Sequence, residues 1–142
     1  MVRRETILVG AVLAALAGCG RTGPALPAAV PAKGMIQLAD GTPLREGRLE
    51  LIPRDGNGVE AFGDVQPDGS FTLTSYKVND GAVPGRYVVA ISPYNYAARG
   101  GSPTPVTGAA RIPAKYLESG TSTLEVEVKA PDIVLQLRLD PR

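Results

Sequence analysis

The sequence predicts an all-β domain of seven short strands, arranged as an antiparallel sandwich or barrel. From Lys33 onward, short runs of alternating apolar and polar residues are separated by clusters of Gly, Pro, Asp and Asn. No apolar pattern of helical period follows Ala17. With 142 residues, 44% of them hydrophobic and 20% charged, the chain is long enough for one globular domain and an appendage.

The first two predicted strands flank a turn. Met35 to Leu38 forms the first, and Asp40-Gly41-Thr42-Pro43 turns the chain toward the second, Arg48 to Pro53. In the second strand, Leu49 and Leu51 alternate with charged residues. Because successive side chains of a strand point to opposite faces, one face of this strand is expected to meet water.

The third and fourth predicted strands form a hairpin. Glu60 to Gln66 and Ser70 to Ser75 flank Gln66-Pro67-Asp68-Gly69, a turn with proline early and glycine late. A loop then leads to the fifth strand, Gly85 to Ser92, which places Tyr87, Val89 and Ile91 on one face.

The last two predicted strands are Leu124 to Lys129 and Ile133 to Asp140. Both alternate apolar with mostly polar residues, which predicts that each buries one face against a core. Ala130-Pro131-Asp132 is short enough to join them as a C-terminal hairpin.

The segment from residue 93 to 123 lacks this alternation. About thirty residues without a pattern form a long loop for a compact domain, and such loops are often functional or mobile. Residues 113–120 are compatible with one helical turn. Tyr94, Asn95 and Tyr96 at the start of the loop are candidates for contact with a sugar or a peptide, and packing within the loop is the alternative.

The N-terminus has the organisation of an export signal. Arg3 and Arg4 precede an uncharged apolar run from Thr6 to Ala17. A membrane-spanning helix needs about 20 apolar residues, whereas this run covers only about 18 Å of a roughly 30 Å hydrocarbon core. It is therefore too short to remain as a membrane anchor.

The run ends in Leu16, Ala17, Gly18 and Cys19, which resembles the lipobox of bacterial lipoproteins. The resemblance implies that a diacylglycerol is attached to the Cys19 thiol and that signal peptidase II cuts after Gly18. Long acyl chains would then hold the protein to a membrane, since each buried CH₂ contributes about 0.8 kcal/mol. The alternative is an ordinary buried cysteine at the end of a core helix.

These features divide the chain into a signal peptide (residues 1–18), a lipidated N-terminus with a linker (19–32) and a β-domain (33–142). The linker is rich in Gly, Pro and Ala, and at about 3.1 Å per residue it would span roughly 40 Å. Gly20 stands where an aspartate retains proteobacterial lipoproteins at the inner membrane. Because this chain has Gly20 instead of that aspartate, the outer membrane, facing the periplasm, is favoured in a host with two membranes.

Composition argues against several classes of function. Removal of the signal leaves 13 of the 15 basic and 13 of the 14 acidic side chains, so the mature domain lacks the basic field that nucleic acid requires. Histidine is absent, which removes the commonest general base and the commonest transition-metal ligand. A lipid on Cys19 consumes the one thiol. We expect no cofactor, no metal and no catalytic residue.

Several short motifs follow one another along the β-domain: Asp40-Gly41-Thr42-Pro43-Leu44, Leu49-Glu50-Leu51-Ile52-Pro53, residues 65–71, residues 81–87 and Ile112-Pro113-Ala114-Lys115-Tyr116-Leu117 with Ser122-Thr123-Leu124. Their order and spacing resemble the transthyretin-like, carboxypeptidase-regulatory-like domains of exported bacterial lipoproteins over residues 33–139. The resemblance implies a seven-stranded Greek-key sandwich that acts as an accessory or spacer module, although a fold does not by itself transfer an activity.

Two catalytic relatives of this fold do not fit the chain. Hydroxyisourate hydrolases depend on histidines and end in Tyr-Arg-Gly-Ser, whereas this chain ends in Asp140-Pro141-Arg142. Intradiol dioxygenases bind iron through two tyrosines and two histidines, and the five tyrosines here cannot supply the nitrogen ligands.

We therefore expect a non-enzymatic, membrane-anchored envelope lipoprotein that serves as a structural or protein-interaction module. The first alternative is a module that binds a glycan or small ligand through the 93–123 loop. The second is a carboxylate-based hydrolase, since a retaining glycosidase needs only two carboxylates about 5 Å apart.

Overall fold

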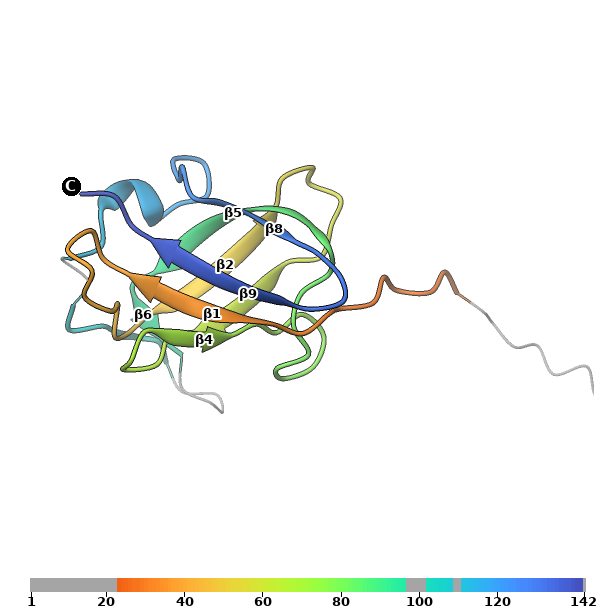
Figure 1. The fold of residues 1–142 in the computed structure, drawn as a ribbon, viewed down its shortest axis with the longest axis horizontal. Helices are drawn as coiled ribbons and strands as arrows, with labels where there is room; N and C mark the ends of the chain where they lie inside the picture. The colour runs from red at the N-terminus through yellow and green to blue at the C-terminus, as the bar shows by residue number, and fades with distance from the viewer. Residues whose placement is uncertain (1–22, 97–101, 109–110, 142) are drawn as a thin grey trace, which may run out of the picture.

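The computed structural model describes residues 23–96, 102–108 and 111–141. The described chain folds into two larger sheets that face each other (Figure 1) and a small two-stranded sheet. In the three-stranded sheet the order is β4 (Ser70–Thr72), β1 (Ala32–Gln37), β9 (Ile133–Arg138). In the four-stranded sheet it is β3 (Ala61–Asp64), β2 (Arg48–Pro53), β5 (Gly85–Ser92), β8 (Glu125–Val128).

The alternation in the sequence determines which side chains enter the space between the two sheets. Leu49 and Leu51 of the four-stranded sheet are fully buried, as is Ile36 of the three-stranded sheet. They belong to one continuous hydrophobic core to which both sheets contribute. The predicted all-β character is confirmed, and the faces predicted to be buried are the ones that meet in this core.

The expectation that the strands are all antiparallel is wrong for one pair. β1 and β9 run parallel in register, from Ala32 opposite Ile133 to Gln37 opposite Arg138. Parallel strands need a crossover connection, and here residues 38–132, with all the other strands, lie between the two. The first and last strands of the described chain therefore lie side by side in the three-stranded sheet.

The predicted C-terminal hairpin is also wrong. β8 pairs with β5 in one sheet and β9 pairs with β1 in the other, so residues 129–132 carry the chain across the sandwich. The two strands bury their apolar faces as predicted, because Val128 and Leu137 approach the same core from opposite sides. Alternation identifies a buried face, and it does not identify the sheet to which the strand belongs.

The predicted hairpin at residues 60–75 forms its turn but bridges the two sheets. The Gln66 N–H donates to the Ser70 carbonyl at 2.8 Å, which closes the turn. β3 then joins the four-stranded sheet and β4 the three-stranded one. Phe62 and Thr74 exchange two backbone hydrogen bonds of 3.0 and 2.8 Å, so the hairpin closes this edge of the sandwich.

A part of the described 93–123 segment packs against the domain. Tyr94–Asn95 (β6) and Thr104–Pro105 (β7) form the small antiparallel sheet, and Ala114–Tyr116 (η2) is a 3-10 turn within the predicted helical stretch. The Tyr116 ring is fully buried in the core, and Val106 and Ile112 are also buried. These buried side chains attach the segment to the core, although its sequence has no alternating pattern.

The contacts of the domain extend into the stretch assigned to the linker. Val30 exchanges two backbone hydrogen bonds with Ala82, of 2.9 and 3.0 Å, and the Tyr76 hydroxyl donates to the Pro27 carbonyl at 2.9 Å. Gly81 permits this approach, because a Cβ at that position would lie 1.8 Å from the Val30 carbonyl oxygen. The linker leaves one end of the sandwich and the C-terminus lies at the other (Figure 1). In the described ranges, no helix is long and apolar enough to cross a membrane.

Candidate functional site

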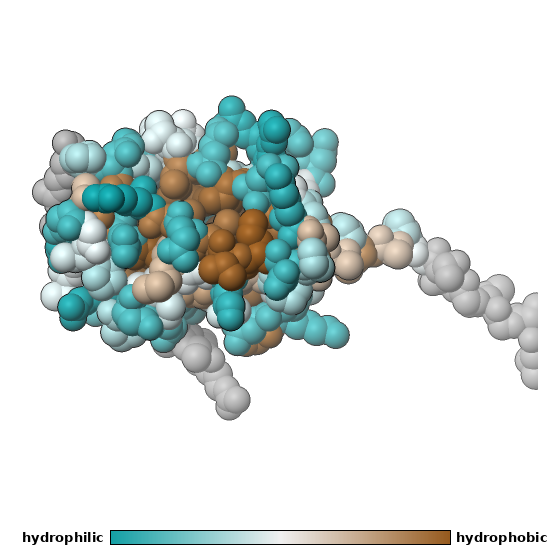
Figure 2. Space-filling view, viewed as in Figure 1, coloured by the Kyte–Doolittle hydropathy of each residue, from teal (hydrophilic) through white to brown (hydrophobic). Residues whose placement is uncertain are grey.

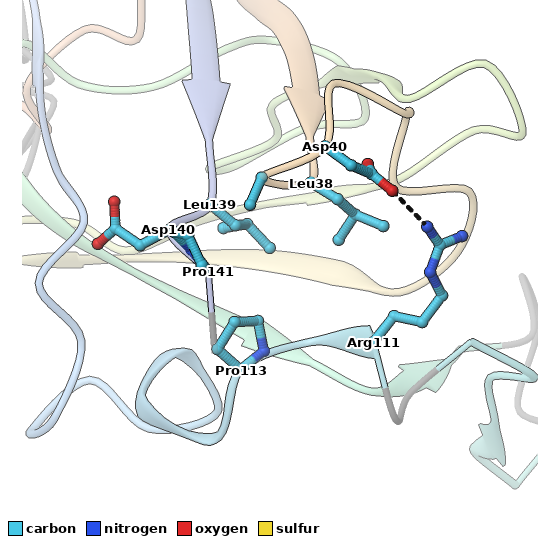
Figure 3. A pocket seen from close by; sticks show the side chains of 8 residues that line it. Leu38, Asp40, Arg111, Pro113, Leu139, Asp140 and Pro141 are labelled. Carbon is cyan, nitrogen blue, oxygen red and sulfur yellow. Dashed lines mark hydrogen bonds and ion pairs between the residues drawn. The ribbon is translucent and has the colours of Figure 1, made fainter.

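The end of the sandwich opposite the linker carries an open cavity of about 340 Å³ (Figure 3). Leu38 follows β1 and Leu139 follows β9, and these two buried side chains lie at its base with Pro113. Asp40 and Arg111 form its charged rim, where their side chains point toward each other at 3.2 Å. The pairing of β1 with β9 brings the two strand ends together and so creates the cavity.

The two carboxylates at this cavity are both engaged in hydrogen bonds. The Thr42 hydroxyl donates to Asp40 at 2.6 Å, and this bond is the main reason that the pKa of Asp40 lies below its ordinary value. The Lys115 ammonium donates to Asp140 at 2.7 Å and likewise lowers the pKa of Asp140. The Asp140 carboxylate points away from Asp40 (Figure 3).

This arrangement does not suit the chemistry of a glycosidase. A general acid needs a carboxyl whose pKa is raised, and it must share a cleft with a second carboxylate. Asp40 and Asp140 have lowered pKa values and diverge. Neither carboxyl at this cavity therefore has the raised pKa of a general acid.

A second cavity, of about 230 Å³, lies on the other side of Arg111. Its lining is mainly aliphatic and charged, with Leu38 and Arg111 shared between the two cavities. Sugar recognition commonly uses an aromatic platform, and no aromatic residue lines either cavity. The complete set lining the second cavity is Leu38, Pro43, Leu44, Arg45, Glu46, Thr107, Gly108 and Arg111.

A separate cluster on the outer face of the four-stranded sheet surrounds Arg48. Its guanidinium makes two hydrogen bonds to Asp64, of 2.7 and 3.1 Å. It also lies over two aromatic rings, 4.5 Å from the centre of Phe62 and 4.1 Å from that of Tyr96. The register of the sheet explains the cluster, because Arg48 stands directly opposite Asp64 on β3.

The three predicted contact residues do not form one surface. Tyr94 and Asn95 are exposed on β6, where Tyr94 keeps 42% of its surface. Tyr96 is half-buried, stacked on Arg48 with its hydroxyl 3.1 Å from the Ser92 hydroxyl. Packing accounts for Tyr96, while Tyr94 and Asn95 remain available to a ligand.

The other predicted site residues lie outside the described part of the chain. These are Cys19, the predicted lipid attachment site, and Leu16, Ala17 and Gly18 of the lipobox. Within residues 23–96, 102–108 and 111–141, no three His, Cys, Asp or Glu side chains gather in a group that could hold a metal.

Sequence reasoning missed the residues around the distal cavity and the Arg48 cluster. Arg111 and Asp40 are 71 positions apart, and no local motif connects them. Arg48 and Asp64 lie in consecutive predicted strands and carry opposite charges. Pairing these two strands in register would have predicted their contact.

Comparison with known proteins gives one structural likeness. No family model matches the sequence, and no curated protein matches it. The chain is similar in structure to the major pilin subunit of Bacillus cereus, with 16% sequence identity and a TM-score of 0.44. The match covers 80% of this chain, which spans 30% of the length of the pilin chain.

Proposed function

We propose that the protein is a lipid-anchored lipoprotein of the bacterial cell envelope. The observation that carries the proposal is the sequence Leu16-Ala17-Gly18-Cys19 at the end of a short apolar run with a basic start. The outer membrane, on its periplasmic side, is the proposed location in a host with two membranes. The linker that leaves one end of the domain is consistent with attachment at that end.

For the domain, we propose a transthyretin-like Greek-key sandwich. The order β4-β1-β9 facing β3-β2-β5-β8 supports this, since successive strands repeatedly change sheet. The C-terminal crossover between β8 and β9 and the closure of β1 against β9 support it further.

The role we propose for this domain is structural or protein-interacting rather than enzymatic. The engaged, diverging carboxylates at the distal cavity support this, as does the absence of histidine from the sequence. The outer face of the three-stranded sheet is the proposed contact surface, because Val134 keeps 60% of its surface exposed there and half-buried Met35 lies beside it.

The anchor is tested with Cys19→Ala in the full chain, expressed in a bacterial host with a labelled fatty acid. The variant should lose acyl labelling and signal cleavage. Gly23→Ala should retain both, because a Cβ at position 23 has no neighbouring atom within 4 Å. Labelling that persists in Cys19→Ala contradicts the proposed function.

The interaction role is tested by photocrosslinking in intact cells. A photoreactive residue at position 134, on the three-stranded face, should give discrete crosslinked products with envelope proteins. The same residue at position 127, on the opposite face, is the matched control and should give few. Equal patterns at both positions would contradict the assignment of the surface.

A second candidate is a glycan or small-ligand module that uses the 93–123 segment. The exposure of Tyr94 and Asn95 favours it. Tyr94→Ala should then abolish binding to a glycan array, while Leu117→Ala, at a similarly exposed side chain, should not. Tyr94 is the better test than Tyr96, because truncation of Tyr96 would also uncover Arg48.

A further inference from the structure

Two strongly exposed apolar side chains belong to segments that meet where the linker leaves the domain. Val78 keeps 85% of its surface exposed and Leu26 keeps 73%, the two largest values among the exposed large hydrophobic residues of the described chain. Tyr76, 39% exposed, connects the two segments, because its hydroxyl donates to the Pro27 carbonyl. Lys77 is exposed next to Val78.

The loop that presents Val78 is held in shape by its own hydrogen bonds. The Asp80 carboxylate accepts backbone N–H groups from Ser75, Tyr76 and Lys77, at 2.7, 3.0 and 2.9 Å. The Asn79 N–H donates to the Thr74 hydroxyl at 2.9 Å. A loop fixed in this way loses little conformational entropy when it binds a surface. The Asp80 carboxylate therefore faces these backbone N–H groups rather than solvent.

The same loop is fixed to the linker. Beyond the Tyr76 contact, the Gly81 backbone lies so close to Val30 that no side chain fits between them. In Figure 1 the loop lies beside the start of the linker, at the end of the sandwich away from the C-terminus. The loop and the linker are therefore adjacent at this end of the domain, where Val78 also lines a groove along the β4 edge.

We infer that this end of the domain is a second, direct membrane contact, made by Leu26 with the loop Ser75 to Asp80. The inference rests on the proposed lipid anchor at Cys19. From Cys19 to Leu26 the chain spans about 22 Å if extended at about 3.1 Å per residue, so the loop lies within reach of the anchoring membrane.

The chemistry of the loop fits a phospholipid surface. Val78 and Leu26 provide apolar groups for the boundary between headgroups and acyl chains, and tyrosine is enriched at that depth. Lys77 provides a cation for anionic headgroups. Each fully buried aliphatic side chain increases partition into the membrane by about tenfold.

Fluorescence quenching tests the inference, because the chain contains no tryptophan. The full chain carrying Val78→Trp is purified from membranes and reconstituted in vesicles of phosphatidylethanolamine and phosphatidylglycerol with brominated acyl chains. The emission should shift to the blue and be quenched several-fold more strongly than in Leu117→Trp. Leu117 adjoins η2, which packs against the C-terminal Asp140 through Tyr116 and so lies far from the linker.

A second pair of variants separates insertion from mere proximity. Val78→Asp in the Leu117→Trp background should fold normally, since the Val78 side chain is exposed. On vesicles, its loop should be cleaved by protease faster than the loop of Leu117→Trp alone. Lys77→Glu in the Val78→Trp background should reduce quenching on anionic vesicles and leave it unchanged on uncharged ones.

Acyl labelling on the same preparations distinguishes the two proposals. Labelled protein in which Val78→Trp and Leu117→Trp are quenched equally overturns the membrane contact and leaves the anchor standing. A blue shift without quenching overturns it as well, because the residue at position 78 is then buried against the domain or a second copy of this chain rather than in lipid. Absence of labelling contradicts the anchor, and with it the contact that rests on it.

Discussion

The two outer faces of the sandwich are built differently. On the four-stranded face, charged side chains pair with their neighbours: Arg48 binds Asp64 under the Tyr96 ring, and Arg54 binds Glu125. On the three-stranded face, the rows of opposed residues are Thr72, Lys33 and Val134, and then Ser70, Met35 and Gln136. Within the described residues, no ion pair joins the outward side chains of this face.

The difference between the faces concerns how many of their outward side chains already have partners within the domain. On the four-stranded face, a partner that covers Arg48 or Arg54 would have to compete with their ion pairs. The three-stranded face carries exposed apolar surface, visible over β1 and β9 among hydrophilic side chains (Figure 2). It continues around the β4 edge into a groove of about 760 Å³. Because exposed apolar patches often mark interaction sites, this surface is the one that we propose for a partner.

Gly34→Ala should have the largest effect on this contrast. A Cβ at position 34 would lie 2.1 Å from the Leu135 carbonyl oxygen and 2.8 Å from the Phe71 ring, so β1 could not stay against β9. We expect about 3 kcal/mol less stability in urea unfolding, as for overpacking in a rigid core. Gly120→Ala, where nothing lies within 4 Å, is the control and should change little. A fully stable Gly34→Ala protein would contradict the close packing of this sheet.

Arg48→Ala should have a moderate effect on the other face. It removes the paired hydrogen bonds to Asp64 and two contacts with aromatic rings, which together contribute about 1 to 2 kcal/mol at a partly exposed site. Lys33→Ala on the three-stranded face removes an exposed charge and should change stability by less than about 0.5 kcal/mol. Equal losses in the two variants would remove the distinction between the faces.

Acid should produce the smallest effect, and it should begin at the ends of the three-stranded sheet. Asp40 after β1, Asp68 before β4 and Asp140 after β9 all have a pKa below the ordinary 3.8, mainly because of hydrogen bonds from Thr42, Ser70 and Lys115 respectively. A carboxyl whose pKa is lower in the folded state stabilises the fold above pH 3.8, and this contribution is lost as the pH falls through the folded value.

Hydrogen exchange at a series of pH values measures this loss. Protection of the amides of β1, β4 and β9 should be constant above about pH 5 and fall below about pH 4. Ser70→Ala removes the largest cause of the Asp68 shift and should make the protection of β4 less dependent on pH. Protection in β4 that falls equally in both proteins would contradict this role for Ser70.

The sequence predicted several strand bounds because their information is local, whereas the first strand, predicted as Met35 to Leu38, runs from Ala32 to Gln37. Arg48–Pro53 and Gly85–Ser92 have the predicted bounds, and the turn at Gln66 to Gly69 closes as its proline and glycine indicate. Alternation also identified the buried faces, since a side chain two positions along a strand returns to the same side. The export signal and the lipobox are equally local and remain predictions.

Only the tertiary structure decided which strands share a sheet and which distant residues meet. Alternation is the same for a hairpin and for two strands on opposite sides of one core, so the crossover between β8 and β9 was not visible in it. The parallel closure of β1 with β9 then created the distal cavity from Leu38 and Leu139. The stack of Tyr96 on Arg48 and the link from Tyr76 to the linker also join residues far apart in the chain. The physical reason is that local propensity sets the direction of each side chain, whereas the sheet partner is chosen by the burial of the whole core.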